Sequence, residues 1–159
     1  MRIKQKVCLI GSLRFYDEML EIANLLANQG VPILIPTPGK YRKNTDPGHY
    51  ISAYNHIPHK EKVREEGRRV HAHLEKIIIS DLIYIVNPGG YVGFNTAVEI
   101  CFAYTKGKHI YAMEAIRDRD SLFLMNFVER TLPPEELLTL VTYTNSATVL
   151  KQPVPKKTL

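Results

Sequence analysis

Four short stretches of the chain are almost continuously apolar, and longer amphipathic stretches separate them. The apolar stretches are residues 7–11 (VCLIG), 31–36 (VPILIP), 82–87 (LIYIVN) and 109–113 (HIYAM). Continuous rather than alternating hydrophobicity is typical of parallel strands that are covered on both faces. We therefore expect these four stretches to form strands of one mainly parallel sheet.

The stretches between the strands have the residue spacing of helices. The first of them carries an apolar stripe made of Met19, Ile22, Ala23, Leu26 and Ala27. Gly30 follows at a position that suits a helix end. A second helix is expected from about Lys60 to Ile79, and a third from about Thr96 to Gly107. This alternation of strands and helices predicts an α/β fold with an open, doubly wound sheet and right-handed crossovers.

The remaining segments are less regular. Residues 117–130 and residues 133–140 are expected to form two further helices, and residues 140–144 are considered as a short extra strand. Residues 37–58 are rich in Gly, Pro, Asn and Tyr and form an unusually long connection. We interpret them as a lid over the ligand edge of the sheet, with an inert surface excursion as the alternative. Residues 1–150 are expected to form one domain, and residues 151–159 a disordered basic tail.

Composition narrows the classes of function. The chain has 159 residues, of which 45% are hydrophobic and 23% charged, as in ordinary globular proteins. No apolar run approaches the ~20 residues of a membrane span, and Cys8 and Cys101 lack the spacing of a disulfide or metal motif. We therefore expect a cytoplasmic protein with reduced cysteines and no membrane partner. The net charge of +5 favours an anionic ligand such as phosphate, or is simply a solvated basic surface. The basic residues are scattered, so nucleic-acid binding is not expected.

Two glycine-containing loops follow predicted strands. Gly11, Ser12 and Arg14 lie where the first strand gives way to a helix, and a helix N-terminus with a nearby guanidinium can bind an anion. The structural alternative is a helix start that Ser12 caps. The second loop contains Gly89, Gly90 and Gly93, whose backbone can form a nest for a phosphate or a sugar. This loop matches neither a Walker motif nor GxGxxG, so no ATP, NAD or other cofactor is expected.

Glu99 admits two interpretations. Thr96 and Glu99 have the spacing of a capping box, in which the glutamate accepts a hydrogen bond from the N–H of the cap residue. Alternatively, a carboxylate in the first turn of the helix is kept ionised by the helix dipole and attacks the anomeric carbon of a sugar. The residue types and their spacing favour neither interpretation over the other. The six histidines lack the spacing of a metal site, so no metal is expected.

Three segments together resemble the nucleoside 2-deoxyribosyltransferase superfamily, which includes the 2'-deoxynucleoside 5'-phosphate N-hydrolases. They are residues 7–14 (VCLIGSLR), residues 73–88 (HLEKIIISDLIYIVNP) and residues 93–113 (GFNTAVEICFAYTKGKHIYAM). In the last segment, Glu99-x-x-x-Ala103 followed by Gly107-Lys108 is the most specific feature. The resemblance covers roughly residues 6 to 115.

The resemblance implies a Rossmann-like sheet of about five strands, a homodimer or higher homo-oligomer, and a nucleoside or nucleotide as the small-molecule partner. It implies that Glu99 attacks C1' of the sugar and displaces the base. It also implies that a 5'-phosphate is held by Gly11, Ser12 and Arg14 and by the turn from Gly93 to Asn95.

The chain departs from the family pattern at two places. His73 occupies the position of the aspartate that orients the glutamate and handles the protons of the base, and Cys101-Phe102 replaces Gly-Tyr. Histidine can carry a proton but supplies no fixed negative charge. The sharper hypothesis places the His73 ring beside Glu99 with a raised pKa, and the plainer one is a buried neutral histidine. The function predicted is N-glycosidic cleavage or transfer, with a non-catalytic nucleotide-binding domain as the alternative.

Overall fold

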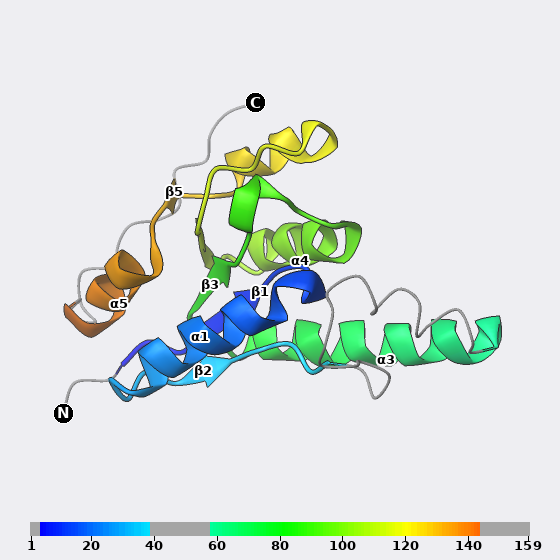
Figure 1. Cartoon of the computed structure of the whole chain (residues 1–159), viewed down its shortest axis with the longest axis horizontal. Coiled ribbons are helices and arrows are strands. Elements are labelled where there is room, and N and C mark those ends of the chain that lie inside the picture. Colours follow the sequence, from blue (N-terminus) through cyan, green and yellow to red (C-terminus); the bar gives the residue numbers. More distant parts are fainter. Residues whose placement is uncertain (1–3, 39–57, 144–159) are drawn as a thin grey trace.

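The sheet is parallel throughout and confirms the predicted doubly wound α/β class. The computed structural model describes residues 4–38 and 58–143 of the chain (Figure 1). Five strands hydrogen-bond in the order β2-β1-β3-β4-β5. Their bounds are β1 Val7–Ile10, β2 Ile33–Leu34, β3 Leu82–Ile85, β4 His109–Ala112 and β5 Arg130–Thr131. The expected lid, residues 37–58, and the expected tail, residues 151–159, lie almost wholly outside the described residues.

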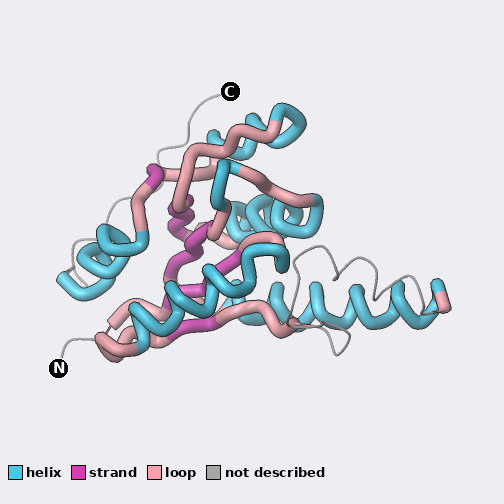
Figure 2. Tube along the Cα trace, in the orientation of Figure 1, coloured by secondary structure: helices cyan, strands magenta, loops and turns pink. Residues whose placement is uncertain are grey.

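Helices cover both faces of this sheet (Figure 2). The α-helices are α1 Tyr16–Ala27, α3 His59–Ile78, α4 Phe94–Thr105 and α5 Pro134–Tyr143. Short 3-10 helices are η1 Leu13–Phe15, η2 Pro88–Gly90 and η3 Arg119–Asn126. The side chains of α1 and α5 share one apolar cluster with the strands, and those of α3, α4 and η3 share the other. The sheet is therefore the middle layer of three.

Neighbouring residues of one strand belong to different clusters. Val7 and Leu9 of β1 pack toward α1, whereas Cys8 and Ile10 pack toward α3 and α4, and all four have 0% exposure. Successive side chains of a strand point to opposite faces, so a strand covered on both faces must be apolar at every position. Each large aliphatic side chain buried in this way contributes about 1.5–3 kcal/mol. This explains why the strands appear in the sequence as unbroken apolar runs.

Two predictions for the C-terminal part were wrong. Residues 140–143, considered as a strand, belong to α5, because Leu137 and Val141 are four residues apart and pack together in the cluster beneath α1. The fifth strand is instead Arg130–Thr131, both exposed, so hydrophobicity could not reveal it. The expected α-helix over residues 117–130 is the 3-10 helix η3, with Asp118 as its N-cap.

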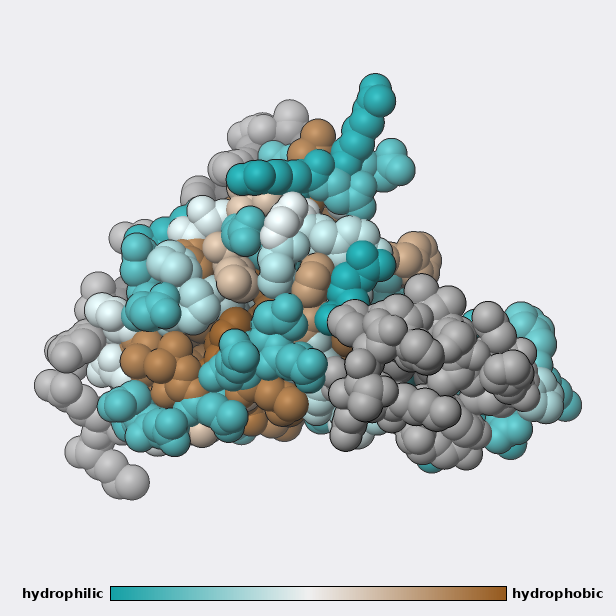
Figure 3. All heavy atoms as spheres, viewed as in Figure 1, coloured by the Kyte–Doolittle hydropathy of each residue, from teal (hydrophilic) through white to brown (hydrophobic). Residues whose placement is uncertain are grey.

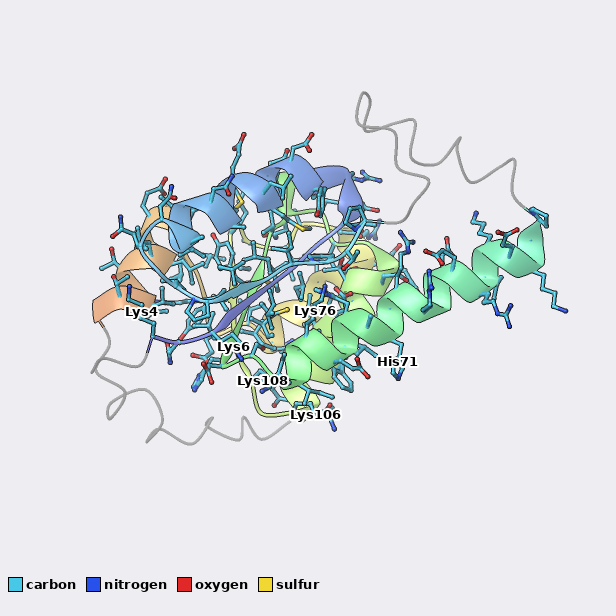
Figure 4. All side chains as sticks on the ribbon, turned by 90° about the horizontal axis from the view of Figure 1, so that it is seen from below. Lys4, Lys6, His71, Lys76, Lys106 and Lys108 are labelled. Atoms are coloured by element: carbon cyan, nitrogen blue, oxygen red, sulfur yellow. The ribbon has the colours of Figure 1, made fainter. Side chains whose placement is uncertain are left out.

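One half of the long helix α3 is fixed to the rest of the molecule. The ammonium group of Lys108, labelled in Figure 4, donates to the carbonyl oxygens of Ile78, the last residue of α3, and of Ser80 just beyond it. Lys76 donates to the carbonyl oxygen of Ile35 at 2.8 Å and to the hydroxyl of Thr37 at 2.9 Å. The other half of α3 projects beyond the sheet in Figure 1. The C-terminal half of α3 is therefore held by hydrogen bonds to the rest of the molecule, and the N-terminal half extends beyond the sheet.

The surface seen in Figure 3 is mostly polar, with apolar residues showing between polar ones near α1 and α5. Those helices also meet in the cluster that contains Leu26 and Leu137. Among the helices that the structure describes, none has the length and apolar character needed to cross a membrane.

Candidate functional site

A cavity of about 580 Å³ lies at the carboxyl edge of the sheet, between the loops that follow β1 and β3. In a sheet with the order β2-β1-β3-β4-β5, the strand order reverses between β1 and β3, and ligands bind at such a point. The cavity brings together most residues that the sequence predicted for the site: Gly11, Ser12, Arg14, His73, Gly93, Asn95 and Glu99. A volume of this size is typical of sites for small-molecule ligands.

The loop after β1 needs a glycine for close packing. A Cβ atom on Gly11 would collide with the backbone carbonyl oxygen of Val86, at the end of the neighbouring strand. Ser12 caps η1, because its hydroxyl accepts a hydrogen bond from the Arg14 backbone N–H at 3.5 Å. The capping role considered for Ser12 is therefore present, and the residue also lines the cavity.

Arg14 contacts Tyr91 across the cavity mouth. The guanidinium carbon of Arg14 lies 4.0 Å from the centroid of the Tyr91 ring, and Nη2 donates to the Tyr91 hydroxyl at 3.4 Å. The Phe15 ring meets the Tyr91 ring edge-on, with centroids 6.1 Å apart. Arg14 is exposed, and none of the described residues pairs a carboxylate with it. A free cationic edge is therefore available to a ligand.

The three glycines of the second loop do not form one nest. Of Gly89, Gly90 and Gly93, only Gly93 is among the described residues that line the cavity. Gly90 has a φ of +76°, and a Cβ atom there would collide with the Ala115 carbonyl oxygen. Its N–H already donates to the Asn87 carbonyl oxygen at 2.8 Å. Gly90 therefore serves the turn, whereas the backbone near Gly93 faces the cavity.

The helix that carries Glu99 begins earlier than predicted. Its N-cap is Gly93 and its first residue is Phe94, because the Ala97 N–H already donates to the Gly93 carbonyl oxygen at 2.9 Å. Thr96 therefore lies inside the helix, and no capping box forms with Glu99. Glu99 is the sixth helical residue and lies in the second turn, so both the capping prediction and the first-turn prediction were wrong.

Burial determines the protonation of Glu99. The side chain is 7% exposed, and its burial raises the pKa of the carboxyl group to about 8. The helix dipole acts mainly within the first turn, so at the second turn it does not offset the loss of hydration. The raised pKa contradicts the prediction of a carboxylate that the helix dipole keeps ionised. At neutral pH Glu99 holds its proton.

His73 lies next to this carboxyl group, as the sharper hypothesis expected. Its Nε2 atom is 3.9 Å from Oε1 of Glu99, and the residue is 3% exposed. Burial, with a smaller contribution from the Lys76 ammonium group, lowers the pKa of His73 to about 4, although the Leu9 backbone favours the charged form. The expected rise in pKa was wrong, because Glu99 is itself neutral. Within the described residues, neither ring nitrogen of His73 makes a hydrogen bond of normal geometry.

Several residues of the cavity wall were not predicted. Glu66 lies seven residues before His73, so both face the same side of α3 and line the cavity with Arg69. Tyr91 lines the mouth and Thr37 the opposite wall. The helical spacing from Glu66 to His73 was a usable signal. Nothing in the sequence indicated that Tyr91 would turn toward Arg14.

Comparisons with known proteins bear on the fold. No family model matches the sequence, and no curated protein matches it. Among solved structures, the chain is similar to a conserved protein from Enterococcus faecalis V583, with a TM-score of 0.55, 16% identity, and coverage of 87% of this chain and 98% of that one. A weaker likeness, with a TM-score of 0.44 and 17% identity, joins 86% of this chain to 97% of the Clostridium botulinum CMP N-glycosidase BcmB.

The first likeness shows that a protein of nearly the same length shares the fold, and the second is too low to add to this. Among the described residues, no group of three His, Cys, Asp or Glu side chains is placed to hold a metal ion.

Proposed function

We propose that the protein cleaves or transfers the N-glycosidic bond of a nucleoside or nucleoside 5'-monophosphate, with Glu99 as the nucleophile. The observation that carries the proposal is the buried pair of Glu99 and His73, 3.9 Å apart in the wall of a ligand-sized cavity. The likeness of residues 7–14, 73–88 and 93–113 to nucleoside 2-deoxyribosyltransferases supports the same assignment.

The pair carries one acidic proton over a wide pH range. Glu99 is protonated below about pH 8, and His73 takes up its own proton only below about pH 4. Between these values the carboxyl group keeps its acidic proton, the imidazole is neutral with one N–H, and the pair has no net charge. The acidic proton is the one an N-glycosidic leaving group needs, because a departing base must be protonated as its bond to C1' breaks.

The first chemical step uses this proton and the carboxylate that it leaves behind. The Glu99 proton passes through His73 to a nitrogen or oxygen atom of the base. The C1'–N bond then breaks with its electron pair going to the base, and an oxygen of Glu99 forms a bond to C1'. The products are the neutral base and a glycosyl ester of Glu99, while His73 is again neutral.

The second step releases the sugar. His73 takes a proton from water, or from an acceptor base in a transfer reaction, and the resulting nucleophile attacks C1'. The bond between C1' and Glu99 breaks, and the proton on His73 returns to Glu99. Two displacements at one carbon retain its configuration. The residues of the pair are thus restored to their starting protonation.

The anionic end of a nucleotide is expected to bind near Arg14. No described residue pairs a carboxylate with Arg14, which lines the cavity together with Gly93 and Asn95 at the start of α4. Helix N-termini and guanidinium groups both favour phosphate. A 5'-phosphate bound at this end leaves the sugar between it and Glu99.

A second candidate function is nucleotide binding without turnover. The raised pKa of Glu99 favours it, because a carboxyl group that is protonated at neutral pH is a poor nucleophile. One experiment separates the two candidates. The protein is incubated with each common nucleoside and 5'-monophosphate, in ribo and deoxy forms, and free base is measured by liquid chromatography. Base release that requires Glu99 supports the enzyme, and binding without release supports the alternative.

A further inference from the structure

Tyr91 connects the two loops that border the cavity. On one side it contacts Arg14, with 4.0 Å between the guanidinium carbon and the ring centroid. Phe15 from the same loop packs edge-on against the ring at an interplanar angle of 72°. The hydroxyl end of the ring lies over Gly93, where an added Cβ atom would be 3.4 Å from the Tyr91 oxygen. The ring is therefore held between the loop after β1 and the N-cap of α4.

The contact with Tyr91 leaves most N–H groups of Arg14 available to a ligand. The guanidinium carbon lies over the Tyr91 ring, whereas phosphate binds to the N–H groups of a guanidinium group. Of those N–H groups, one is directed to the Tyr91 hydroxyl at 3.4 Å. An exposed arginine without such a contact samples many rotamers, which must be lost when an anion binds. Contact with Tyr91 restricts Arg14 before the ligand arrives.

We propose that Tyr91 is a positioning residue that orients Arg14 toward the anionic group of the ligand, so that the site selects nucleotides over nucleosides without phosphate. The proposal rests on the proposed function, in which Arg14 contacts the 5'-phosphate. Tyr91 acts through Arg14 and has no part in the chemistry at C1'. Its effect therefore falls on ligands that carry phosphate.

The test compares two ligands that differ only in their phosphate. Dissociation constants are measured by titration calorimetry for a 2'-deoxynucleoside 5'-monophosphate and its parent nucleoside, using the base that binds most tightly. The proteins are the wild type, Tyr91→Leu, Tyr91→Phe, Arg14→Ala and the double variant Arg14→Ala/Tyr91→Leu. Tyr104→Leu is the matched control, because Tyr104 stacks on Phe127 and is not among the described residues that line the cavity.

The expected quantity is the preference for the monophosphate, expressed as the ratio of the two dissociation constants. Tyr91→Leu should reduce this ratio about 3- to 10-fold while the nucleoside constant changes less than about twofold. Tyr91→Phe should keep most of the preference, because the ring remains and only a long hydrogen bond is lost. On the Arg14→Ala background, Tyr91→Leu should have no further effect on the ratio. Tyr104→Leu should match the wild type.

Several results would overturn the role of Tyr91. One is a wild type that binds the monophosphate no more tightly than the nucleoside. Another is a Tyr91→Leu variant that binds both ligands more weakly by the same factor. The third is a Tyr91→Leu effect on the ratio that is just as large in the Arg14→Ala background. A wild type that prefers the monophosphate but releases no base overturns the enzymatic proposal and leaves this one standing. If the wild type releases base but Tyr91→Leu leaves the ratio of the two dissociation constants unchanged, the role of Tyr91 is overturned and the enzymatic proposal stands. A wild type that binds neither ligand overturns both.

Discussion

Two histidine–glutamate pairs in this protein differ in depth and in geometry. Nδ1 of His109 lies 2.6 Å from Oε1 of Glu129, and the two side chains are 18% and 36% exposed. Nε2 of His73 lies 3.9 Å from Oε1 of Glu99, and these side chains are 4% and 9% exposed. The outer pair lies within hydrogen-bond distance and is partly exposed, whereas the inner pair is farther apart and nearly buried.

The difference teaches that surroundings, rather than partner identity, determine what such a pair does. The outer pair joins β4 to the residue that precedes β5, where the Glu129 N–H also donates to the Ile110 carbonyl oxygen. It thus helps to hold the edge of the sheet. In the inner pair, loss of hydration disfavours both charged forms, so a proton stays on Glu99. A protonated Glu99 beside a neutral His73 can transfer a proton, but without opposite charges the pair contributes little to holding the structure together.

The comparison is tested most strongly by removing each carboxylate while keeping its shape. Glu99→Gln should reduce base release by about 10³-fold or more, because glutamine supplies neither the proton nor the nucleophile. Glu129→Gln is the matched control and should keep activity within about twofold. Base release is measured by liquid chromatography under single-turnover conditions. Unchanged release in a folded Glu99→Gln protein would remove Glu99 from the mechanism.

The histidines can be compared in the same way. His73→Ala should lose roughly 10²–10⁴-fold in base release, the usual contribution of general acid–base catalysis. His73→Asp should keep part of the rate, because aspartate can also carry a proton, and should shift the pH optimum. His109→Ala should remain close to the wild type. Full activity in His73→Ala would show that Glu99 protonates the base without help.

The pH dependence of kcat/KM should report the inner pair. Activity should fall as pH rises through about 8, where Glu99 loses the proton that the base requires. It should also fall below about pH 4, where His73 becomes charged and can no longer accept that proton. Initial rates from pH 3 to pH 10 would define both limbs, each expected to change about tenfold per pH unit far from the optimum. A rate that keeps rising above pH 9 would mean that the ionised carboxylate alone is the active form.

Replacing Glu99 should raise the free energy of unfolding, although it lowers activity. Its pKa is raised on folding, so folding costs nothing extra below about pH 4.5, and stability is lost as pH rises from there to about 8. Glu99→Gln should therefore unfold in urea with a free energy about 1–3 kcal/mol higher than the wild type at pH 7.5, and with a similar one at pH 4.5. A less stable variant at pH 7.5 would mean that the protonated carboxyl group makes a hydrogen bond that the amide cannot replace.

The smallest expected effect belongs to the outer pair. A double-mutant cycle with His109→Ala and Glu129→Ala should give a coupling free energy of about 0.2–1 kcal/mol, as for other partly exposed pairs of polar side chains. Urea unfolding of the four proteins measures it. A coupling above about 2 kcal/mol would show that partial exposure to water does not weaken this pair and would remove the contrast with the inner one.

Most of the fold could be predicted because burial on both faces of a sheet leaves a direct trace in the sequence. The four apolar stretches assigned to strands contain β1, β2, β3 and β4, and helical spacing located α1 and α3. The strand Arg130–Thr131 left no such trace, since its side chains are exposed and backbone hydrogen bonds alone define it. An edge strand of this kind forms because its backbone pairs with the neighbouring strand β4, and not because of its own side chains.

The sequence indicated which residues would meet at the carboxyl edge of the sheet, but not their electrostatics. Arg14, His73 and Glu99, which the motif likeness and the strand ends indicated, line one cavity, and their role in binding or catalysis stays a prediction. The direction of both pKa predictions was wrong, because pKa depends on how completely each group is shielded from water. That shielding arises from side chains distant in the sequence, such as the neighbours of His73 on β1 and α4. The residues next to His73 and Glu99 in the sequence therefore do not indicate how completely these groups are shielded from water.

The attachment of α3 has a mechanical consequence. The helix is fixed near Ile77 and Lys76, and in the described part of the chain its buried side chains are His73 and Ile77. Glu66 lies about 10 Å farther along the axis, toward the projecting end. A small tilt about the fixed end would therefore displace Glu66 much more than His73. Glu66 is therefore the part of the α3 cavity wall that is held least firmly, and the imidazole beside Glu99 is the part held most firmly.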